Sequence, residues 1–340
     1  MTGWPSPRGV GRSLALTGAV AVVGVLGAGP AAAAQPPVPS TPLFTFQGND
    51  VFESSGLVDR GDVVYTNNDS GDDAVVYGVD SRTGRVVSRT TYADSATDVE
   101  AIAPGSDGTV WAGDTGDNRA NRDDVQVYRL QPRDGDHPGT RYDLAYPDGS
   151  HDAETLLVQP RTQRIFVVSK SAFGGTVYAA PRHLSTHGTN RLRPFARVGG
   201  LVTDGTFFPD GRHVLLRTYG TATVYTFPGF EPTGTVTLPP QPQGEGISVS
   251  ASGRVLVSSE GTRAQVLQVR LPARLTSPRA PVSTSGPKPS TTPPSEGSGS
   301  TPVRPRSTGD WVGIGAVAVA IAGVVVLVVR SVPRHGRRRP

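Results

Sequence analysis

Short apolar runs separated by polar turns recur along the middle of the chain. Each recurrence opens with an acidic or small polar residue and a short apolar run, then has a turn that often holds Asp-Gly or Ser-Gly. A second apolar run ends in a polar loop, and a third run rich in Val and Tyr follows. Runs of this length, bounded by Gly, Asp and Pro, are typical of β-strands. The pattern therefore predicts an all-β domain.

Five copies of this unit follow one another. Their opening residues are Ser55, Glu100, Glu154, Asp204 and Glu245. The second apolar runs and the loops after them read DVVYTNNDSGD, TVWAGDTGDN, RIFVVSK, HVLLRTYG and RVLVSSEG. A repeat of roughly 40 to 50 residues that holds several short strands is the signature of a β-propeller blade.

A fourth strand completes most copies. It is predicted at 86–92, 140–146, 195–200 and 233–238. The fifth copy has no such strand after Leu271, but the segment from Leu43 to Phe46, before the first copy, is placed to supply it and close the ring. We therefore favour five blades, and six is the alternative if the longer units contain an extra one. A β-sandwich is less favoured because it would not explain the repeat.

Residues 1–34 predict a secretory signal peptide. A basic start precedes an apolar run from Leu14 to Gly29, and small residues follow it. This order of a basic, an apolar and a small-residue region is typical of a cleaved leader. A permanent signal anchor is the alternative, but the short run rich in Gly and Ala favours removal after Ala32 or Ala34.

Residues 310–330 predict one transmembrane helix. The segment from Trp311 to Val329 carries no charge and would extend about 28 Å as a helix, close to the thickness of a bilayer's hydrocarbon core. A cluster of arginines begins at Arg330 and continues through the tail, 331–340. Such clusters stay on the cytoplasmic side. The expected location is therefore the cell membrane, with a single pass and the propeller outside.

The segment 273–309 predicts a disordered linker, because it is dense in Pro, Ser, Thr and Gly and has few aliphatic residues. The folded domain is then 35–272. It holds 27 acidic and 21 basic residues, a net charge of about −6, although the whole chain is formally +4. An acidic domain disfavours nucleic acid as a partner. The absence of cysteine excludes disulfides and thiol catalysis.

The strand order of a propeller predicts where polar residues gather. The first strand of each blade starts at one face of the ring, and the second runs back and ends at that face. The five opening residues therefore meet the loops that follow the second runs. Those loops contribute Asn68, Asp69, Asp72, Asp114, Asp117, Asn118, Lys170, Arg217 and Glu260. We expect an acidic mouth at one end of the central channel.

Carboxylates held close together repel one another, which raises their pKa values. A bound cation, or the basic groups Lys170 and Arg217, would relieve the repulsion. A hard cation such as calcium prefers clustered oxygen ligands, so Glu100, Glu154 and Glu245 are the predicted metal ligands. The other predicted ligand-binding residues are Ser55, Asn68, Asp69, Asp114, Lys170, Asp204, Arg217 and Glu260. The alternative is that these Asp-Gly and Asn-Asp pairs only form turns.

Successive copies carry the motifs E-x-S-G-L with N-D-S-G-D, D-V-E-A-I-A with G-D-T-G-D-N-R, D-A-E-T-L-L-V with V-V-S-K, T-D-G with L-R-T-Y, and G-E-G-I with S-S-E-G. In this combination, from Glu53 to Pro272, the sequence resembles a set of actinobacterial exported β-propellers, which are WD-repeat-like and of no established function. It is distantly similar to phytase-like and esterase-like propellers. In phytase-like propellers, calcium ions in an acidic channel bind phosphate, but none of their metal motifs is matched here residue by residue. The resemblance therefore implies the fold more than an activity.

Two functions are consistent with these features. We favour a binding or scaffolding module tethered at the cell surface, with calcium as a candidate cofactor and an extracellular ligand or protein as partner. The linker, the tether and the lack of a G-x-S-x-G, H-E-x-x-H or P-loop motif support it. The alternative is a metal-assisted hydrolase of phosphate or other esters, in which Lys170 and Arg217 would hold the anion while calcium polarises it. Fold alone does not choose between them.

Overall fold

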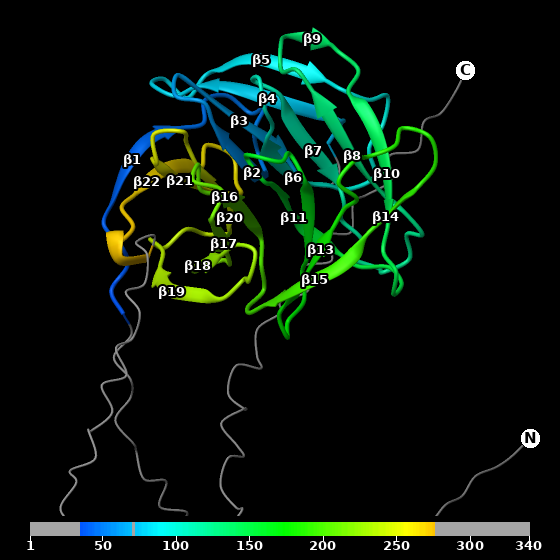
Figure 1. Cartoon of the computed structure of the whole chain (residues 1–340). Coiled ribbons are helices and arrows are strands. Elements are labelled where there is room, and N and C mark those ends of the chain that lie inside the picture. Colours follow the sequence, from blue (N-terminus) through cyan, green and yellow to red (C-terminus); the bar gives the residue numbers. More distant parts are fainter. Residues whose placement is uncertain (1–34, 70–71, 276–340) are drawn as a thin grey trace, which may run out of the picture. The chain divides into compact units, whose positions relative to one another are not determined.

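The computed structural model describes residues 35–69 and 72–275, and the strands of this part form five sheets arranged around an axis (Figure 1). It is a five-bladed β-propeller. This confirms the expected all-β class and the prediction of five blades rather than six. The predicted signal peptide and transmembrane helix lie outside the described residues. Within the described ranges, no helix has the length and apolar character needed to span a membrane.

The strands of each blade follow one another in the chain, except in the last blade. Blade 1 consists of β2 (Ser54–Asp59), β3 (Val63–Asn68), β4 (Val75–Asp80) and β5 (Val86–Thr91). Blade 2 consists of β6 (Val99–Pro104), β7 (Val110–Asp114), β8 (Val125–Leu130) and β10 (Thr140–Ala145). Blade 3 consists of β11 (Ala153–Val158), β12 (Ile165–Ser169), β13 (Gly175–Ala179) and β15 (Arg193–Val198).

Blade 4 consists of β16 (Asp204–Phe207), β17 (His213–Arg217), β18 (Thr221–Thr226) and β19 (Pro232–Thr237). Blade 5 consists of β20 (Gly244–Val249), β21 (Val255–Ser259), β22 (Gln265–Val269) and β1 (Ser40–Thr45). The fourth strands expected from the sequence are thus all present. A short 3-10 helix, Ala273–Leu275, follows blade 5 and buries Leu275 between blades 4 and 5.

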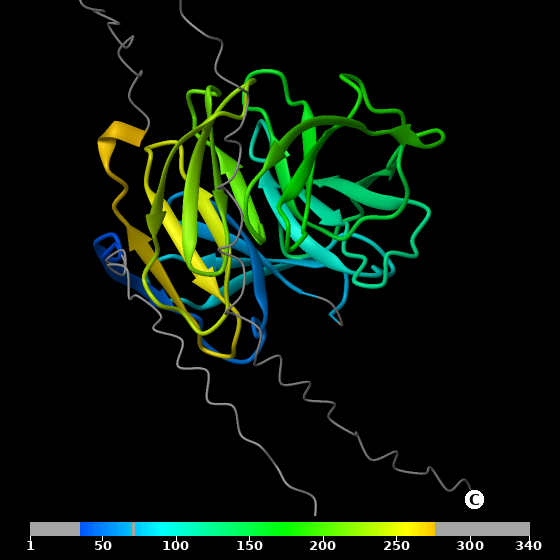
Figure 2. The ribbon, with the colours of Figure 1, turned by 90° about the horizontal axis from the view of Figure 1, so that it is seen from below.

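The ring is closed by the strand nearest the N-terminus. β1 pairs antiparallel with β22, from Ser40 opposite Val269 to Thr45 opposite Gln265, and the two strands lie together at the rim of the ring (Figures 1 and 2). This confirms that the segment before the first copy supplies the missing strand. At the centre, β2 contacts β6 and β20, β11 contacts β6 and β16, and β16 contacts β20, so the inner strands form a continuous circle.

Two short strands join neighbouring blades at their outer edges. β9 (Gly135–Asp136) belongs to the chain segment of blade 2 but pairs parallel with β5 of blade 1. β14 (Asn190–Arg191) belongs to the segment of blade 3 but pairs parallel with β10 of blade 2. Each covers part of an outer edge whose backbone groups would otherwise be open to pairing with another chain.

The core of the described residues is divided among the blade interfaces. One apolar cluster lies between each pair of adjacent blades, and these clusters hold residues from the facing sheets of both. The cluster between blades 5 and 1 contains Phe44 and Phe46, whose ring centroids are 5.4 Å apart, together with Leu57 and Leu256. The segment that closes the ring is therefore held by side-chain packing as well as by its strand pairing.

Replacing Phe46 by Ala should lower the free energy of unfolding by about 3–5 kcal/mol, because its side chain is only 1% exposed and its removal leaves a cavity between blades 5 and 1. Urea unfolding followed by circular dichroism measures the loss. Phe173→Ala is the matched control, since Phe173 is 99% exposed, and it should change stability by less than about 0.5 kcal/mol. Equal losses in the two variants would argue against the role of the closing segment.

Candidate functional site

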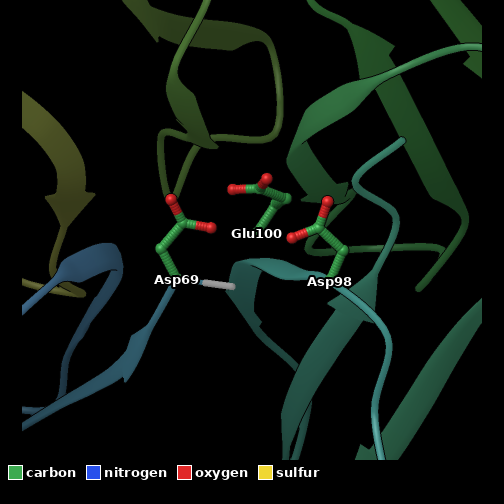
Figure 3. A group of neighbouring side chains, drawn as sticks. All are labelled: Asp69, Asp98 and Glu100. Carbon is green, nitrogen blue, oxygen red and sulfur yellow. The ribbon is translucent and has the colours of Figure 1, made fainter. Parts of the chain in front are cut away.

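Three carboxylates from blades 1 and 2 converge at one mouth of the ring. Asp69 follows β3, Asp98 precedes β6 and Glu100 lies in β6. One ligand atom from each lies within 4.8 Å of the others, and Figure 3 shows the three side chains turned toward one another. Glu100 is only 2% exposed. A hydrogen bond joins the carboxyl groups of Glu100 and Asp69, and it contributes to the raised pKa of Glu100.

The backbone of Gly116 leaves room for this cluster. Gly116 stands in the loop after β7, and its N–H donates to the carbonyl of Asp98 over 3.1 Å. A Cβ at this position would lie 2.7 Å from Glu100 Oε1 and still nearer to the Asp98 carboxylate. The glycine of the GDTGDN loop therefore has a steric role beside the carboxylates, in addition to forming a turn.

Asp114 and Asn68 support the loops that carry the cluster. Asp114 accepts hydrogen bonds of 2.9 Å from the backbone N–H of Asp98 and of the residue before it, and pairs with Arg122 at 2.8 Å. Asn68 accepts from the N–H groups of residues 52 and 53 and donates to the Asp72 carboxylate. Both residues are predicted ligand-binding residues, and in the structure these hydrogen bonds hold the loops that carry Asp69 and Asp98.

A second group of charges comes from blades 3, 4 and 5. Glu154, in β11, forms an ion pair with Lys170 through its Oε1. Its Oε2 is buried and has no hydrogen-bond partner among the described residues, although Glu154 is only 5% exposed. The Lys170 ammonium lies 5.6 Å from the centre of the Tyr219 ring. Lys170 thus neutralises one oxygen of Glu154 and leaves the other without a partner.

Glu245, in β20, and Glu260, after β21, complete the mouth. Burial raises the pKa of Glu245 to about 7; the Lys170 charge opposes this rise, and Glu260 adds to it. Burial, followed by the charge of Asp69, raises the pKa of Glu260 to about 7 as well. The electrostatic interactions of Asp69 with both groups connect blade 5 to the cluster of blades 1 and 2.

The pKa values of the two innermost carboxyl groups are also raised. Burial, and then the charges of Asp69, Glu154 and Asp98, raise the pKa of Glu100 far above its usual range. Burial raises the pKa of Glu154 despite the opposing charge of Lys170. The mouth therefore holds more negative charge than its own basic groups can neutralise, as the recurring acidic positions indicated.

Three other predicted ligand residues lie between blades and are used there. Arg217 is fully buried, and its guanidinium donates to the carbonyls of Gly246 and Ser258 at 2.7 and 2.8 Å. Asp204 is fully buried and accepts from Ile247 N–H at 2.7 Å. Ser55 donates to the carbonyl of the residue that opens blade 2, over 2.6 Å. These hydrogen bonds join blades 4 and 5 and blades 1 and 2, and they do not support an anion-binding role for the Arg217 side chain.

The sequence interpretation missed Asp98, although a signal was present. In the first three copies an acidic residue stands two positions before the opening residue: Glu53, Asp98 and Asp152. Residues two apart on an extended chain point to the same side. The opening residue and the acidic residue before it could therefore have been assigned to the same mouth. Tyr219 had no comparable signal, because its position depends on the loop after β17.

Comparisons with known proteins give a distant likeness in fold. No family model matches the chain, and no curated protein matches it significantly. A gluconolactonase from Xanthomonas campestris is similar with a TM-score of 0.41 and 15% sequence identity, over 71% of this chain and 96% of that one. A luciferin-regenerating enzyme is similar with a TM-score of 0.39 and 11% identity, over 66% and 93%. Similarity at this low sequence identity and TM-score gives no information about the activity of this protein.

With divalent cations removed, the stability of the domain should fall as the pH rises from about 5 to about 8. The pKa of Glu245 is about 7 in the folded state and near its ordinary value of 4.5 in the unfolded chain, so between these values the folded protein keeps a proton that the unfolded chain has lost. The stabilisation that the protonated Glu245 gives to the folded state is fully present below pH 4.5 and is lost as the pH passes through 7. It amounts to at most about 3 kcal/mol.

Urea unfolding at pH 5, 6, 7 and 8 in chelator tests this. Glu245→Gln should flatten the decline, because glutamine does not titrate. Glu231→Gln, at an exposed position away from the mouth, is the control and should leave the decline unchanged. A decline of the same size in Glu245→Gln and in the unmodified protein would show that this carboxyl group does not cause it.

Proposed function

We propose that this chain is a binding module whose acidic mouth holds a hard divalent cation, with calcium as the candidate, and binds an oxygen-rich extracellular ligand through it. The observation that carries the proposal is that one carboxylate oxygen of Asp98, inside the cluster it forms with Asp69 and Glu100, is buried and has no hydrogen-bond partner among the described residues. A buried carboxylate oxygen without a donor is costly, and a cation would satisfy it.

The donor set fits such an ion. Asp69, Asp98 and Glu100 offer only carboxylate oxygens, which calcium and magnesium prefer over the softer metals. In the proposal these three residues hold the cation, and Glu154 and Glu245 add negative charge beside it. Because the pKa of Glu100 is raised, binding of the cation would release a proton from this group, since metal ligands must be deprotonated.

A cation at the mouth would also give the site its ligand chemistry. A hard cation bound by protein carboxylates on one side accepts oxygen atoms of a ligand on the other. Carboxylates, phosphates and the hydroxyl groups of sugars are ligands of this kind. Lys170 is already paired with Glu154, and Arg217 is buried between blades, so the ligand would be held mainly through the cation.

Calcium in excess should raise the melting temperature of the protein in chelator-free buffer at pH 7.5. Binding to the folded state alone contributes about 2.7 kcal/mol when the free ion is at 100 times its dissociation constant. Glu100→Gln should abolish most of this shift, and Gly116→Ala should weaken it by crowding the carboxylates. Differential scanning calorimetry measures the shifts.

The matched control for this experiment is Glu231→Gln, which removes one exposed carboxylate far from the mouth and should keep the full shift. A melting temperature that does not respond to calcium, magnesium or manganese would overturn the metal-binding proposal. A shift that is unaffected by Glu100→Gln would place the ion elsewhere.

One observation favours a second candidate, metal-assisted hydrolysis of a phosphate or other ester. Glu245 and Glu260 have pKa values of about 7, which suits a carboxyl group that exchanges a proton near neutral pH. Hydrolysis of an ester panel in the presence of calcium, lost in Glu245→Gln but kept in Glu231→Gln, would support it. If the calcium-loaded protein hydrolyses none of these esters, the hydrolase candidate is refuted and the binding function remains.

We propose further that the propeller is exported and tethered, with 1–34 removed as a signal peptide and 310–330 spanning the membrane. The charge pattern of the two ends supports this, because a basic start precedes one apolar run and arginines follow the other. Protease added to whole cells should degrade the propeller and spare the tail. Deletion of 310–340 should release the domain into the medium, and an intact domain in treated cells would refute export.

A further inference from the structure

A groove in blade 3 is lined by arginines. It encloses a cavity of about 340 Å³. Its lining consists of Arg164, Arg182, Arg191 and Arg193, with Ala179, Ala180 and Pro181 between them. No acidic residue contributes to the lining. We call this feature the arginine groove. It stands out because the domain as a whole has an excess of acidic residues.

The four arginines are not neutralised by the protein itself. None of them forms an ion pair within 35–69 and 72–275, whereas Arg122, Arg141 and Arg254 each pair with an aspartate. The side chains of Arg182, Arg191 and Arg193 are exposed and make no hydrogen bond to the rest of the described chain. Guanidinium groups that gather without a carboxylate repel one another, so their convergence costs energy unless an anion joins them.

Arg164 forms a fixed floor for the groove. Its Nε donates to the carbonyl of Ala180 over 2.9 Å, and its guanidinium lies 5.4 Å from the ring centre of Phe166 and 6.0 Å from that of Phe195. This bond uses only Nε, so the terminal nitrogens remain for a ligand. Burial, and then the charges of Arg182 and Arg193, lower the pKa of Arg164, as expected for like charges close together.

The arginine groove lies at the opposite end of blade 3 from the acidic mouth. Arg164 immediately precedes β12, and Lys170 immediately follows it. An extended strand of this length separates its two ends by roughly 17 Å. Arg193 stands opposite Ala179 at the end of β13, which places it at the Arg164 end of the sheet. The arginine groove is thus a site distinct from the carboxylate cluster.

We infer that the arginine groove binds an anion that carries several phosphate groups. Guanidinium groups match the oxygens of phosphate with paired hydrogen bonds, and they do so better than ammonium groups. Several unpaired arginines around one cavity suit a chain of phosphates better than a single one, because each phosphate can meet a separate guanidinium. This inference does not depend on metal binding at the mouth.

Isothermal titration calorimetry of the full-length protein with tripolyphosphate, in chelator and at 0.15 M salt, tests the inference. The triple variant Arg182→Gln, Arg191→Gln and Arg193→Gln should bind roughly tenfold more weakly or worse, since it loses three charge contacts. The control triple variant, Arg85→Gln, Arg212→Gln and Arg270→Gln, removes the same charge at exposed positions outside the groove and should bind within about twofold of the unmodified protein.

Glycerol 1-phosphate, the soluble headgroup of an anionic lipid, separates the two sources of phosphate. It should bind at least about tenfold more weakly than tripolyphosphate, because it can meet fewer guanidinium groups. Equal affinity for the two compounds would overturn the inference in favour of a single lipid headgroup. Equal weakening in both triple variants, or no binding of tripolyphosphate at all, would also overturn it. Unchanged melting temperatures in both variants confirm that they fold.

Discussion

Closure of the ring by β1 is the interaction on which the rest of the structure depends. A strand pairing between the two ends of the domain turns five separate sheets into one circle, and the Phe44 and Phe46 side chains fix that pairing in the cluster between blades 5 and 1. Because each blade packs only against its two neighbours, opening one interface would leave two apolar faces exposed. Closure also brings the starts of all five inner strands to one mouth, which no single blade could do.

The same geometry creates an electrostatic problem at that mouth. Acidic residues that open successive blades are forced toward one another, and burial makes their charges harder to solvate. The protein neutralises part of the charge internally, through Lys170 beside Glu154 and through Arg217 near Glu245 and Asp204. The carboxylates of Asp69, Asp98 and Glu100 converge beside these pairs. This excess of negative charge is the physical basis for proposing a cation there. It arises because the inner strands of the propeller converge on one mouth.

The repeat in the sequence was enough to predict the blades and the strand that closes them, and to favour five blades over six, because strand period and blade spacing are properties of the chain alone. It also placed Glu100, Glu154 and Glu245 near one another. It could not assign hydrogen-bond partners. Arg217 and Asp204 were read as ligand groups because of their register, yet both are fully buried and bonded to backbone groups of blade 5. Whether a polar residue at a given register faces the channel or the neighbouring blade depends on side-chain direction, which the pattern does not encode.

The pairing of β1 with β22 also has a consequence for the timing of folding. Among the described strands, β1 is the first to be synthesised and its partner is the last, so the ring cannot close until the whole domain has been made. Until then the apolar faces that flank the missing interface stay uncovered, and contacts this distant along the chain form slowly. Translation that stops shortly before β22 would leave a nearly complete but open protein. The order of the strands therefore makes the final stability of the domain depend on the synthesis of its last blade.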